Sequence, residues 1–276
     1  MPQVSVMALC RHVGMSRQNY YREKKARRRK QVDEGLIVEL VKGIRKSHKK
    51  MGVRKLYNLL KPELESAGVS IGRDRFFEVM RSHGLLIKRR SRGPRTTYSR
   101  HDFDTYENQL KDLQLDVPHQ AWVCDLTYIR TDEGFMYLSL ITDAYSRKVV
   151  GYHIGDSLEV AGCLKALRQA LRQLPAGRSP VHHSDRGTQY CCKEYILKLK
   201  KHGVKISMTE ENHCYENAKA ERMNGILKDE YGLSLTFKTK LDAVRATKQG
   251  VWLYNEERPH TSLGYRIPSA IHREAA

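Results

Sequence analysis

Trp122-Val-Cys-Asp-Leu-Thr-Tyr-Ile129 is the stretch that decides the fold of this chain. Its residues follow a period of two, which predicts a β-strand over 122–130. One acidic residue, Asp125, stands in the middle of this strand and is flanked by apolar residues. A charge within a central strand is costly unless it is paired or binds a metal ion. Asp125 is therefore the first candidate for a functional side chain.

The sequence after this strand alternates between strand and helix patterns. A turn at Thr131-Asp-Glu-Gly134 leads into a second strand with the same period. The expected elements are strands at 122–130, 135–142, 147–154, 181–184 and 204–208, and helices at about 160–174, 190–201, 217–229 and 241–255. Three meandering strands followed by alternating helices and strands predict an α/β domain, with a mixed five-stranded sheet and helices on both faces.

Two further carboxylates stand in comparable positions. Asp185 directly follows the short strand at 181–184, and Glu221 lies on the helix expected at 217–229. Strand ends and one helix face can bring three acids together, and such a cluster suits the oxygen-seeking Mg²⁺ ion. The chemistry that fits is phosphodiester attack by a two-metal route. One ion activates a water or positions a 3′-hydroxyl, and the other stabilises the leaving oxygen.

A polar stripe along the helix at 217–229 supports this interpretation. The stripe consists of Asn217, Glu221, Asn224 and Lys228. Residues at these spacings share one face of a helix, and the apolar residues between them are expected to pack on the sheet. Lys228 could offset negative charge during the reaction or hold a nearby phosphate. A solvated outer face would produce the same stripe, so this feature has two readings.

The charge of the chain is concentrated in its first third. The 276 residues contain 50 Lys and Arg against 31 Asp and Glu, a net charge of +19. Residues 1–100 hold 26 of the basic and 8 of the acidic residues, a net of +18, and the remainder is nearly neutral. Such asymmetry predicts a polyanion-binding module, and nucleic acid is the favoured polyanion because its phosphates reward clustered Lys and Arg. A merely soluble basic surface is the alternative.

The first basic segment, residues 1–30, resembles a helix-turn-helix. Residues 9–13 form a short apolar-periodic helix, Gly14 permits a tight turn, and Ser16 is a suitable cap for the next helix. The second helix would present donors to base edges or phosphates. These candidate DNA contacts are Arg17, Gln18, Asn19 and Arg22. An ordinary helical pair is the alternative.

Residues 31–90 are expected to form a second helical, DNA-binding module. Helices are predicted at about 33–47, after the basic stretch 24–30, and at about 53–61 and 73–83. Residues 91–118 form a basic and then acidic linker, and 119–276 form the α/β core. The segment 88–100 has six Lys or Arg and no acid, which favours phosphate contact, although a solvated spacer is possible. Its candidate contacts are Lys88, Arg89, Arg90 and Arg92.

Several functional classes are excluded or disfavoured. No run approaches the ~18 apolar residues of a membrane helix, and residues 1–13 lack a signal-peptide pattern, so we expect a cytoplasmic protein without a membrane partner. The six cysteines form no Cys-x-x-Cys pair, and reduced thiols without a structural zinc site are expected. Ser184 beside His183 lacks the Gly-x-Ser-x-Gly elbow of acyl transfer, and that chemistry is rejected.

Five motifs in order carry a resemblance to a known family. They are Trp122…Asp-Leu-Thr-Tyr-Ile129, Tyr137-Leu…Asp143-Ala-Tyr-Ser-Arg147, His183-Ser-Asp-Arg-Gly-Thr-Gln-Tyr190, Asn212-His-Cys-Tyr-Glu-Asn-Ala218 with Glu221, and Tyr254-Asn-Glu-Glu-Arg-Pro-His260. Together they resemble the OrfB-type DDE transposases of bacterial insertion sequences, the IS-three family, which share the retroviral integrase core. The resemblance covers about residues 45–272.

The resemblance implies an RNase H-like core in which Asp125, Asp185 and Glu221 bind Mg²⁺ or Mn²⁺, with two ions expected. It implies cleavage and joining of double-stranded DNA at the terminal inverted repeats of an element and at a target. Lys228 matches the basic residue that such enzymes use near the terminal DNA. Asp143 matches a scaffold position instead. The motif that contains Tyr254, Asn255, Arg258 and His260 is more often structural than catalytic.

The resemblance also implies partners, and it leaves alternatives open. Such transposases commonly act as multimers on DNA near the nucleoid, and many are fused to an upstream reading frame by frameshifting. Glu216 replaces the usual Asp of its motif, with His213 interposed, which bears on the loop before Glu221. A nuclease of the same fold that cuts without joining, and a DNA-binding regulator with a relic core, remain the competing hypotheses.

Overall fold

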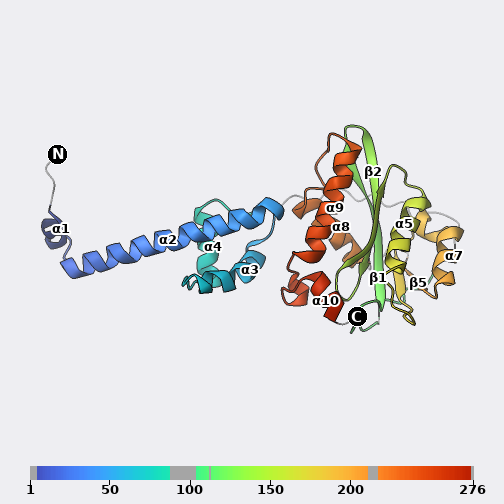
Figure 1. The fold of residues 1–276 in the computed structure, drawn as a ribbon, viewed down its shortest axis with the longest axis horizontal. Helices are drawn as coiled ribbons and strands as arrows, with labels where there is room; N and C mark the ends of the chain where they lie inside the picture. Colours follow the sequence, from blue (N-terminus) through green and yellow to red (C-terminus); the bar gives the residue numbers. More distant parts are fainter. Residues whose placement is uncertain (1–4, 88–103, 112, 211–216, 275–276) are drawn as a thin grey trace. The chain divides into compact units, whose positions relative to one another are not determined.

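The computed structural model describes residues 5–87, 104–111, 113–210 and 217–274 (Figure 1). The chain divides into two compact units. The first comprises Met1–Ser47 and Met51–Lys88, and the second comprises His48–Lys50 and Arg89–Ala276. Within the described residues, no helix is both long and apolar enough to cross a bilayer.

The first unit is entirely helical. Its helices are α1 (Val6–His12), α2 (Arg17–Ser47), α3 (Val53–Ser66) and α4 (Arg73–Ser82). The core of this unit lies between α3, α4 and the C-terminal half of α2, where Ile37, Leu56 and Phe76 are fully buried. Apolar residues of these helices recur at helical spacing and bury one face each, and this burial holds α3 and α4 against the C-terminal half of α2.

The turn between α1 and α2 follows the sequence prediction, but the length of α2 does not. Gly14 adopts a positive φ of 68°, and the Ser16 hydroxyl accepts a hydrogen bond from the Asn19 amide (3.2 Å), as a helix cap does. The expectation of a separate helix beginning near residue 33 is wrong, because α2 runs unbroken through the basic stretch 24–30. Arg, Lys and Glu are strong helix formers, so this stretch continues the helix. A domain boundary at residue 30 would therefore divide a helix.

The second unit is built on the mixed five-stranded sheet that the sequence predicts. Its strands are β1 (Ala121–Thr131), β2 (Gly134–Asp143), β3 (Val149–Gly155), β4 (Val181–Ser184) and β5 (Lys205–Met208), in the order β3-β2-β1-β4-β5. The first three pair antiparallel, and β1, β4 and β5 pair parallel. Strand β1 therefore lies at the centre of the sheet. Gly134, with a φ of 111°, allows the tight turn from β1 to β2.

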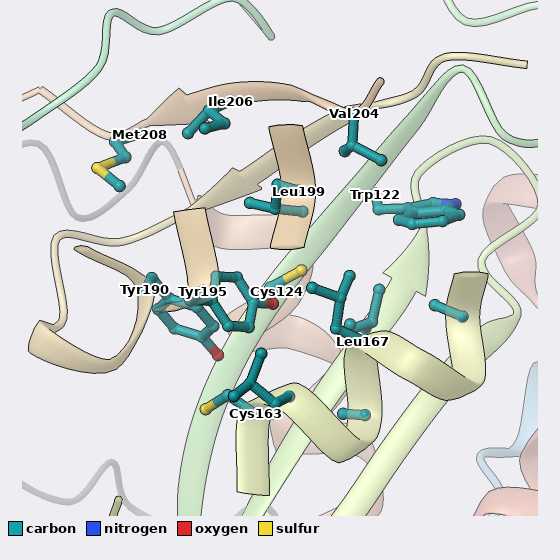
Figure 2. Close-up of a cluster of buried hydrophobic side chains, with 14 of the residues drawn as sticks. Trp122, Cys124, Cys163, Leu167, Tyr190, Tyr195, Leu199, Val204, Ile206 and Met208 are labelled. Atoms are coloured by element: carbon teal, nitrogen blue, oxygen red, sulfur yellow. The ribbon is translucent and has the colours of Figure 1, made fainter. Parts of the chain in front are cut away.

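Helices cover both faces of this sheet (Figure 1). Helices α5 (Val160–Leu171), α6 (Thr188–Cys191) and α7 (Lys193–Lys201) pack on one face, over a core that contains Trp122, Tyr195 and Leu199 (Figure 2). Helices α8 (Ala218–Glu230) and α9 (Lys240–Glu256) pack on the other face, around Ile129 and Leu227. These two cores hold the sheet and so fix the positions of β1 and α8.

Two details of the helices differ from the sequence prediction. The single helix expected over 190–201 is two helices, because the backbone at Cys192 is extended and α7 begins after it. Helix α10 (Pro268–Glu274) was not expected, although a proline at the first helical position is a known start signal. It packs against α9.

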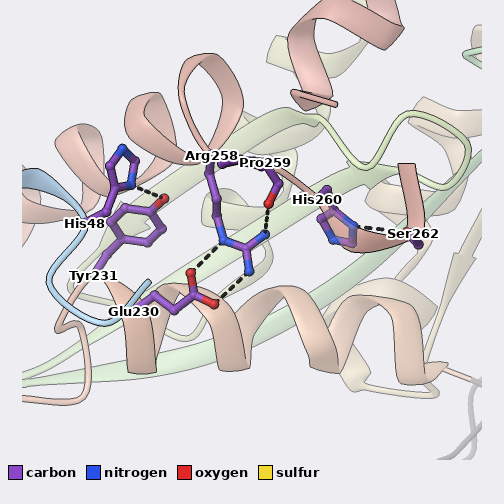
Figure 3. A network of polar contacts seen from close by, with 7 residues as sticks. All are labelled: His48, Glu230, Tyr231, Arg258, Pro259, His260 and Ser262. Atoms are coloured by element: carbon purple, nitrogen blue, oxygen red, sulfur yellow. Dashed lines mark hydrogen bonds and ion pairs between the residues drawn. The ribbon is translucent and has the colours of Figure 1, made fainter. Parts of the chain in front are cut away.

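Polar contacts fix the loops around the sheet. The buried Asp143 carboxylate accepts hydrogen bonds from the His119 amide (2.7 Å) and from both the amide and hydroxyl of Ser146 (2.7 and 2.8 Å). The scaffold role expected for Asp143 is thereby confirmed. Buried Arg258 forms two 2.7 Å hydrogen bonds with Glu230, which ties the end of α8 to the segment after α9 (Figure 3). The motif at 254–260 thus has structural contacts, as expected.

Candidate active site

Parallel pairing of β1 with β4 brings two of the three predicted acids to the same level of the sheet. The register pairs Val123 with His183. Asp125 and Asp185 each lie two residues further along their own chain segments, and β4 ends at Ser184. Neighbouring strands are about 4.8 Å apart, so this register brings the backbone that carries Asp125 close to the point where β4 ends, just before Asp185. This topology brings together two segments that lie 60 positions apart in the sequence.

The third predicted acid is brought to β1 by helix α8. The side-chain amide of Asn217 donates to the backbone carbonyl of Cys124 (2.9 Å), and the side-chain amide of Asn224 donates to the Asp125 carboxylate (2.7 Å). These two contacts hold the first two turns of α8 against the strand, with Ala220 packed between them near Val123. Glu221 lies within this segment of α8, and its side chain is exposed. The helix therefore presents Glu221 beside the strand that carries Asp125.

The pKa of Asp125 is affected by the charges of the other two acids. Its side chain is partly exposed, but the carboxylate is enclosed, and burial raises its pKa from 3.8 to about 7. The negative charges of Asp185 and, to a lesser degree, Glu221 act in the same direction. Hydrogen bonds from Asn224 and from the Leu126 amide (2.9 Å) oppose the rise. Three like charges that repel one another are a favourable environment for a cation.

The donor chemistry of this region fits a divalent metal ion. It consists of carboxylate oxygens, together with the buried Asn217 and Asn224 side-chain oxygens, which have no hydrogen-bond partner among the described residues. In the part of the chain that the structure describes, no three His, Cys, Asp or Glu side chains are gathered closely enough to form a complete metal-binding group. The fit thus rests on donor type and charge repulsion.

The polar stripe of α8 faces the strand in its first two turns. Asn217 and Asn224 are buried, so the solvated-face reading is wrong for these two residues. They were not among the candidate site residues, although their spacing of seven placed them on the same face as Glu221. The signal that could have identified them is a pair of asparagines seven residues apart, on the same helix face as Glu221. Such a pair can hold a helix against a strand by side-chain hydrogen bonds.

Lys228 also lies beside the acids. Its ammonium group stands over the Tyr128 ring, 4.6 Å from the ring centroid. Burial lowers the pKa of Lys228, and the negative charge of Asp125 partly offsets that effect. The charge of Asp125 therefore acts on Lys228, and a contact of Lys228 with DNA stays a prediction. Tyr128, exposed by 37%, was not singled out from the sequence.

The predicted DNA contacts of the first unit lie at the start of α2. Arg17, Gln18, Asn19 and Arg22 are exposed in its first two turns. Their role in DNA binding stays a prediction. The other candidates, Lys88, Arg89, Arg90 and Arg92, lie outside the described residues, as do His213 and Glu216.

A central strand with an enclosed aspartate, an adjacent aspartate after a parallel strand and a glutamate on a packed helix define the class of RNase H-like polynucleotidyl transferases. Comparison with known proteins agrees with this class. Two family models described as integrase core domains match residues 116–214 and 202–268. The simian T-cell lymphotropic virus intasome, solved in complex with the PP2A regulatory subunit B56 gamma, shares the fold. It has a TM-score of 0.50 and 16% identity and covers 80% of this chain and 74% of its own.

Sequence relatives narrow the class to a family. An uncharacterized 31 kDa protein of insertion element IS600 from Shigella sonnei is 33% identical and covers 95% of this chain and 97% of its own length. The transposase of IS629 from the same organism is 32% identical, with coverages of 97% and 91%. Transposase InsF of IS3A from Escherichia coli K12 is 30% identical, with coverages of 83% and 80%. The chain belongs to the IS3 family of insertion-sequence DDE transposases, enzymes that cleave and transfer DNA strands. The predicted family, fold and activity are confirmed.

Proposed function

We propose that this transposase binds double-stranded DNA at the terminal inverted repeats of its element, cleaves there and joins the ends to a target. We further propose that Asp125, Asp185 and Glu221 hold Mg²⁺ or Mn²⁺, as two ions. The observation that carries this proposal is the β1–β4 register, which places Asp125 and Asp185 each two residues beyond the paired Val123 and His183, with α8 held to Asp125 by Asn224. The charges of Asp185 and Glu221, which raise the pKa of Asp125, support it.

Each residue of the site has a distinct role in this proposal. The bound metal would lower the pKa of a water and offset charge on the reacting phosphate. Asn224 holds the Asp125 carboxylate by a 2.7 Å hydrogen bond and so fixes its orientation. Lys228, held over the Tyr128 ring, binds a phosphate oxygen of the DNA strand. The exposed basic residues at the start of α2 supply the contacts with the repeat.

The test replaces each acid by its amide. Asp125→Asn, Asp185→Asn and Glu221→Gln are each expected to abolish metal-dependent cleavage and joining of a duplex that carries the inverted repeats flanking the gene. Binding of that duplex in a gel-shift assay should remain. Asp229→Asn is the matched control, because Asp229 is an exposed acid on the same helix as Glu221. Full activity in any one of the three amide variants contradicts the proposed site.

We also propose that the active form on DNA is a homo-oligomer, since the structural neighbour with the same fold was solved as an intasome. Mass measurement of the protein with and without its repeat duplex tests this, and a monomer on the duplex would contradict it. Whether an upstream-frame fusion is required is tested by comparing strand transfer by this chain alone with that of the fused product. We expect the fusion to be the more active form.

A further inference from the structure

A cavity of about 280 Å³ lies on the flank of α8 that faces away from the three acids. Arg222, Met223 and Ile226 line it from α8, whereas the stripe of Asn217, Glu221, Asn224 and Lys228 occupies the other side of the helix. The cavity also contacts the strand of the proposed active site, because Val123, two residues before Asp125 on β1, lines it. The cavity has no role in the mechanism described above.

Cationic groups border this cavity, and no Asp or Glu is among the described residues that line it. Arg147, Lys219 and Arg222 are among its lining residues. None of the three forms an ion pair with a carboxylate among the described residues. Lys219 and Arg222 are exposed, and Arg147 is half-buried. Three cations around a hollow, without a paired acid, are an environment that attracts an anionic group.

The walls of the cavity are apolar and firmly held. Val123 of β1, Met223 and Ile226 of α8 and the ring of Tyr254 of α9 line them. The Tyr254 hydroxyl donates to the Arg147 carbonyl (2.9 Å), and the Arg258 guanidinium lies 5.5 Å from the Tyr254 ring centroid. Arg147 keeps a φ of 63°, which is unusual for a residue other than glycine. The hydrogen bond from Tyr254 therefore holds the backbone of Arg147 in one position.

We propose that this cavity binds one nucleotide of single-stranded DNA, with the base against the apolar wall and the phosphate near Arg147, Lys219 and Arg222. An apolar wall suits a nucleobase, since every base offers a flat face that packs against apolar groups. The cationic side chains at the mouth of the cavity would attract the phosphate of the same nucleotide. This proposal rests on the proposed function, because Glu221 and Arg222 are adjacent on α8 and the bound nucleotide would belong to the reacting strand.

The first test removes charge from the mouth of the cavity. The salt dependence of binding to fluorescein-labelled oligothymidylate of six nucleotides is measured by fluorescence anisotropy in the absence of divalent metal. The variant Lys219→Gln/Arg222→Gln is expected to reduce the magnitude of the slope of log affinity against log salt by about 1.4, because each phosphate contact on a single strand contributes about 0.7. The matched control is Lys165→Gln/Arg168→Gln, which removes the same two charges from exposed positions of α5, on the other face of the sheet.

The second test fills the cavity without changing its charge. Ser262 lines the mouth and is exposed, so Ser262→Trp places a large side chain there. The parent chain is expected to bind the thymidylate oligomer at least about fivefold more tightly than an oligomer with abasic sites, and Ser262→Trp is expected to lose this difference. Ser262→Ala removes the same hydrogen bond to His260 (3.0 Å) without filling the cavity, and it should keep the difference (Figure 3).

Three outcomes overturn the proposal. They are an unchanged salt slope in the Lys219/Arg222 variant, equal affinity of the parent chain for the two oligomers, and retained discrimination in a Ser262→Trp variant whose circular dichroism is native. Because the assays contain no divalent metal and follow binding only, they can be repeated in the Asp125→Asn background. Failure of the catalytic proposal would leave their results unchanged, so the two proposals can fail separately.

Discussion

Replacing Asp125 with asparagine should stabilise the second unit at alkaline pH even though it removes a proposed catalytic group. The folded chain raises the pKa of Asp125 from 3.8 to about 7, so the folded state binds this proton more tightly than the unfolded state does. Stability from this group is therefore present at acidic pH and is lost as pH rises from about 4 to about 7. Asparagine is neutral throughout and does not incur that loss.

The magnitude follows from the two pKa values. Three pH units between 3.8 and about 7 correspond to about 4 kcal/mol of unfolding free energy at pH 8, and to about 1 kcal/mol at pH 4.5, where the folded carboxyl is protonated. Asn224 already donates to position 125, and its own side-chain oxygen is buried without a partner. An asparagine at position 125 supplies a donor for that oxygen, so the local hydrogen bonds need not be lost.

Both tryptophans of the chain, Trp122 and Trp252, lie in the second unit, so tryptophan fluorescence follows the unfolding of this unit. In metal-free buffer at pH 8, we expect Asp125→Asn to raise the melting temperature by up to about 10 °C. Most of this gain should vanish at pH 4.5. Asp229→Asn, a control at an exposed acid, should change neither value. An absence of gain at pH 8, or an equal gain at both pH values, would refute the argument.

Three further predictions concern the scaffold. Arg258→Ala removes both guanidinium hydrogen bonds from the half-buried Glu230 carboxylate and should lower the unfolding free energy of the second unit by about 3–5 kcal/mol in a urea titration. A loss below about 1 kcal/mol would contradict the structural role of this pair. Gly151→Ala places a Cβ 2.3 Å from the Ala166 carbonyl oxygen and should lower the unfolding free energy of the second unit by about 1–3 kcal/mol. Gly225→Ala has open space around it in α8 and should raise that free energy by up to about 1 kcal/mol. The reverse order would be inconsistent with the packing of α5 on β3. Ser16→Ala removes the cap of α2 and should destabilise the first unit by about 1 kcal/mol, measured by circular dichroism melting, and unchanged melting would show that the cap contributes nothing.

The sequence predicted most of the second unit because its elements have clear local signals. The strand around Asp125 alternates with period two, and α5 carries a regular apolar face, so both were identified close to their observed bounds. Helix α2 was misjudged because a run of like charges was taken to interrupt it, although its residues favour helix. The break at Cys192 has no strong local signal, since neither glycine nor proline stands there.

The candidate site was also predicted only in part from the sequence. Asp125, Asp185 and Glu221 were predicted as site residues from strand context, helix spacing and the resemblance to a family, and their roles stay a prediction. The roles of Asn217 and Asn224 were not identified, because a polar stripe on a helix does not reveal whether solvent or a strand lies opposite it. The cavity beside α8 was also not predicted, since its lining residues come from distant segments of the chain.

The amino-acid sequence by itself determined which residues form strands and helices, where the basic charge lies and which acids are available for catalysis. These properties depend on neighbours within a few positions, or on composition. Only the tertiary structure decided that the segments of Asp125 and Asp185 are brought together by the β1–β4 register, that two side-chain amides fasten α8 to β1, and that three cationic residues border a cavity. The reason is physical: register, burial and charge repulsion arise from contacts between segments that folding brings together, and a pattern along the chain carries no record of those distances.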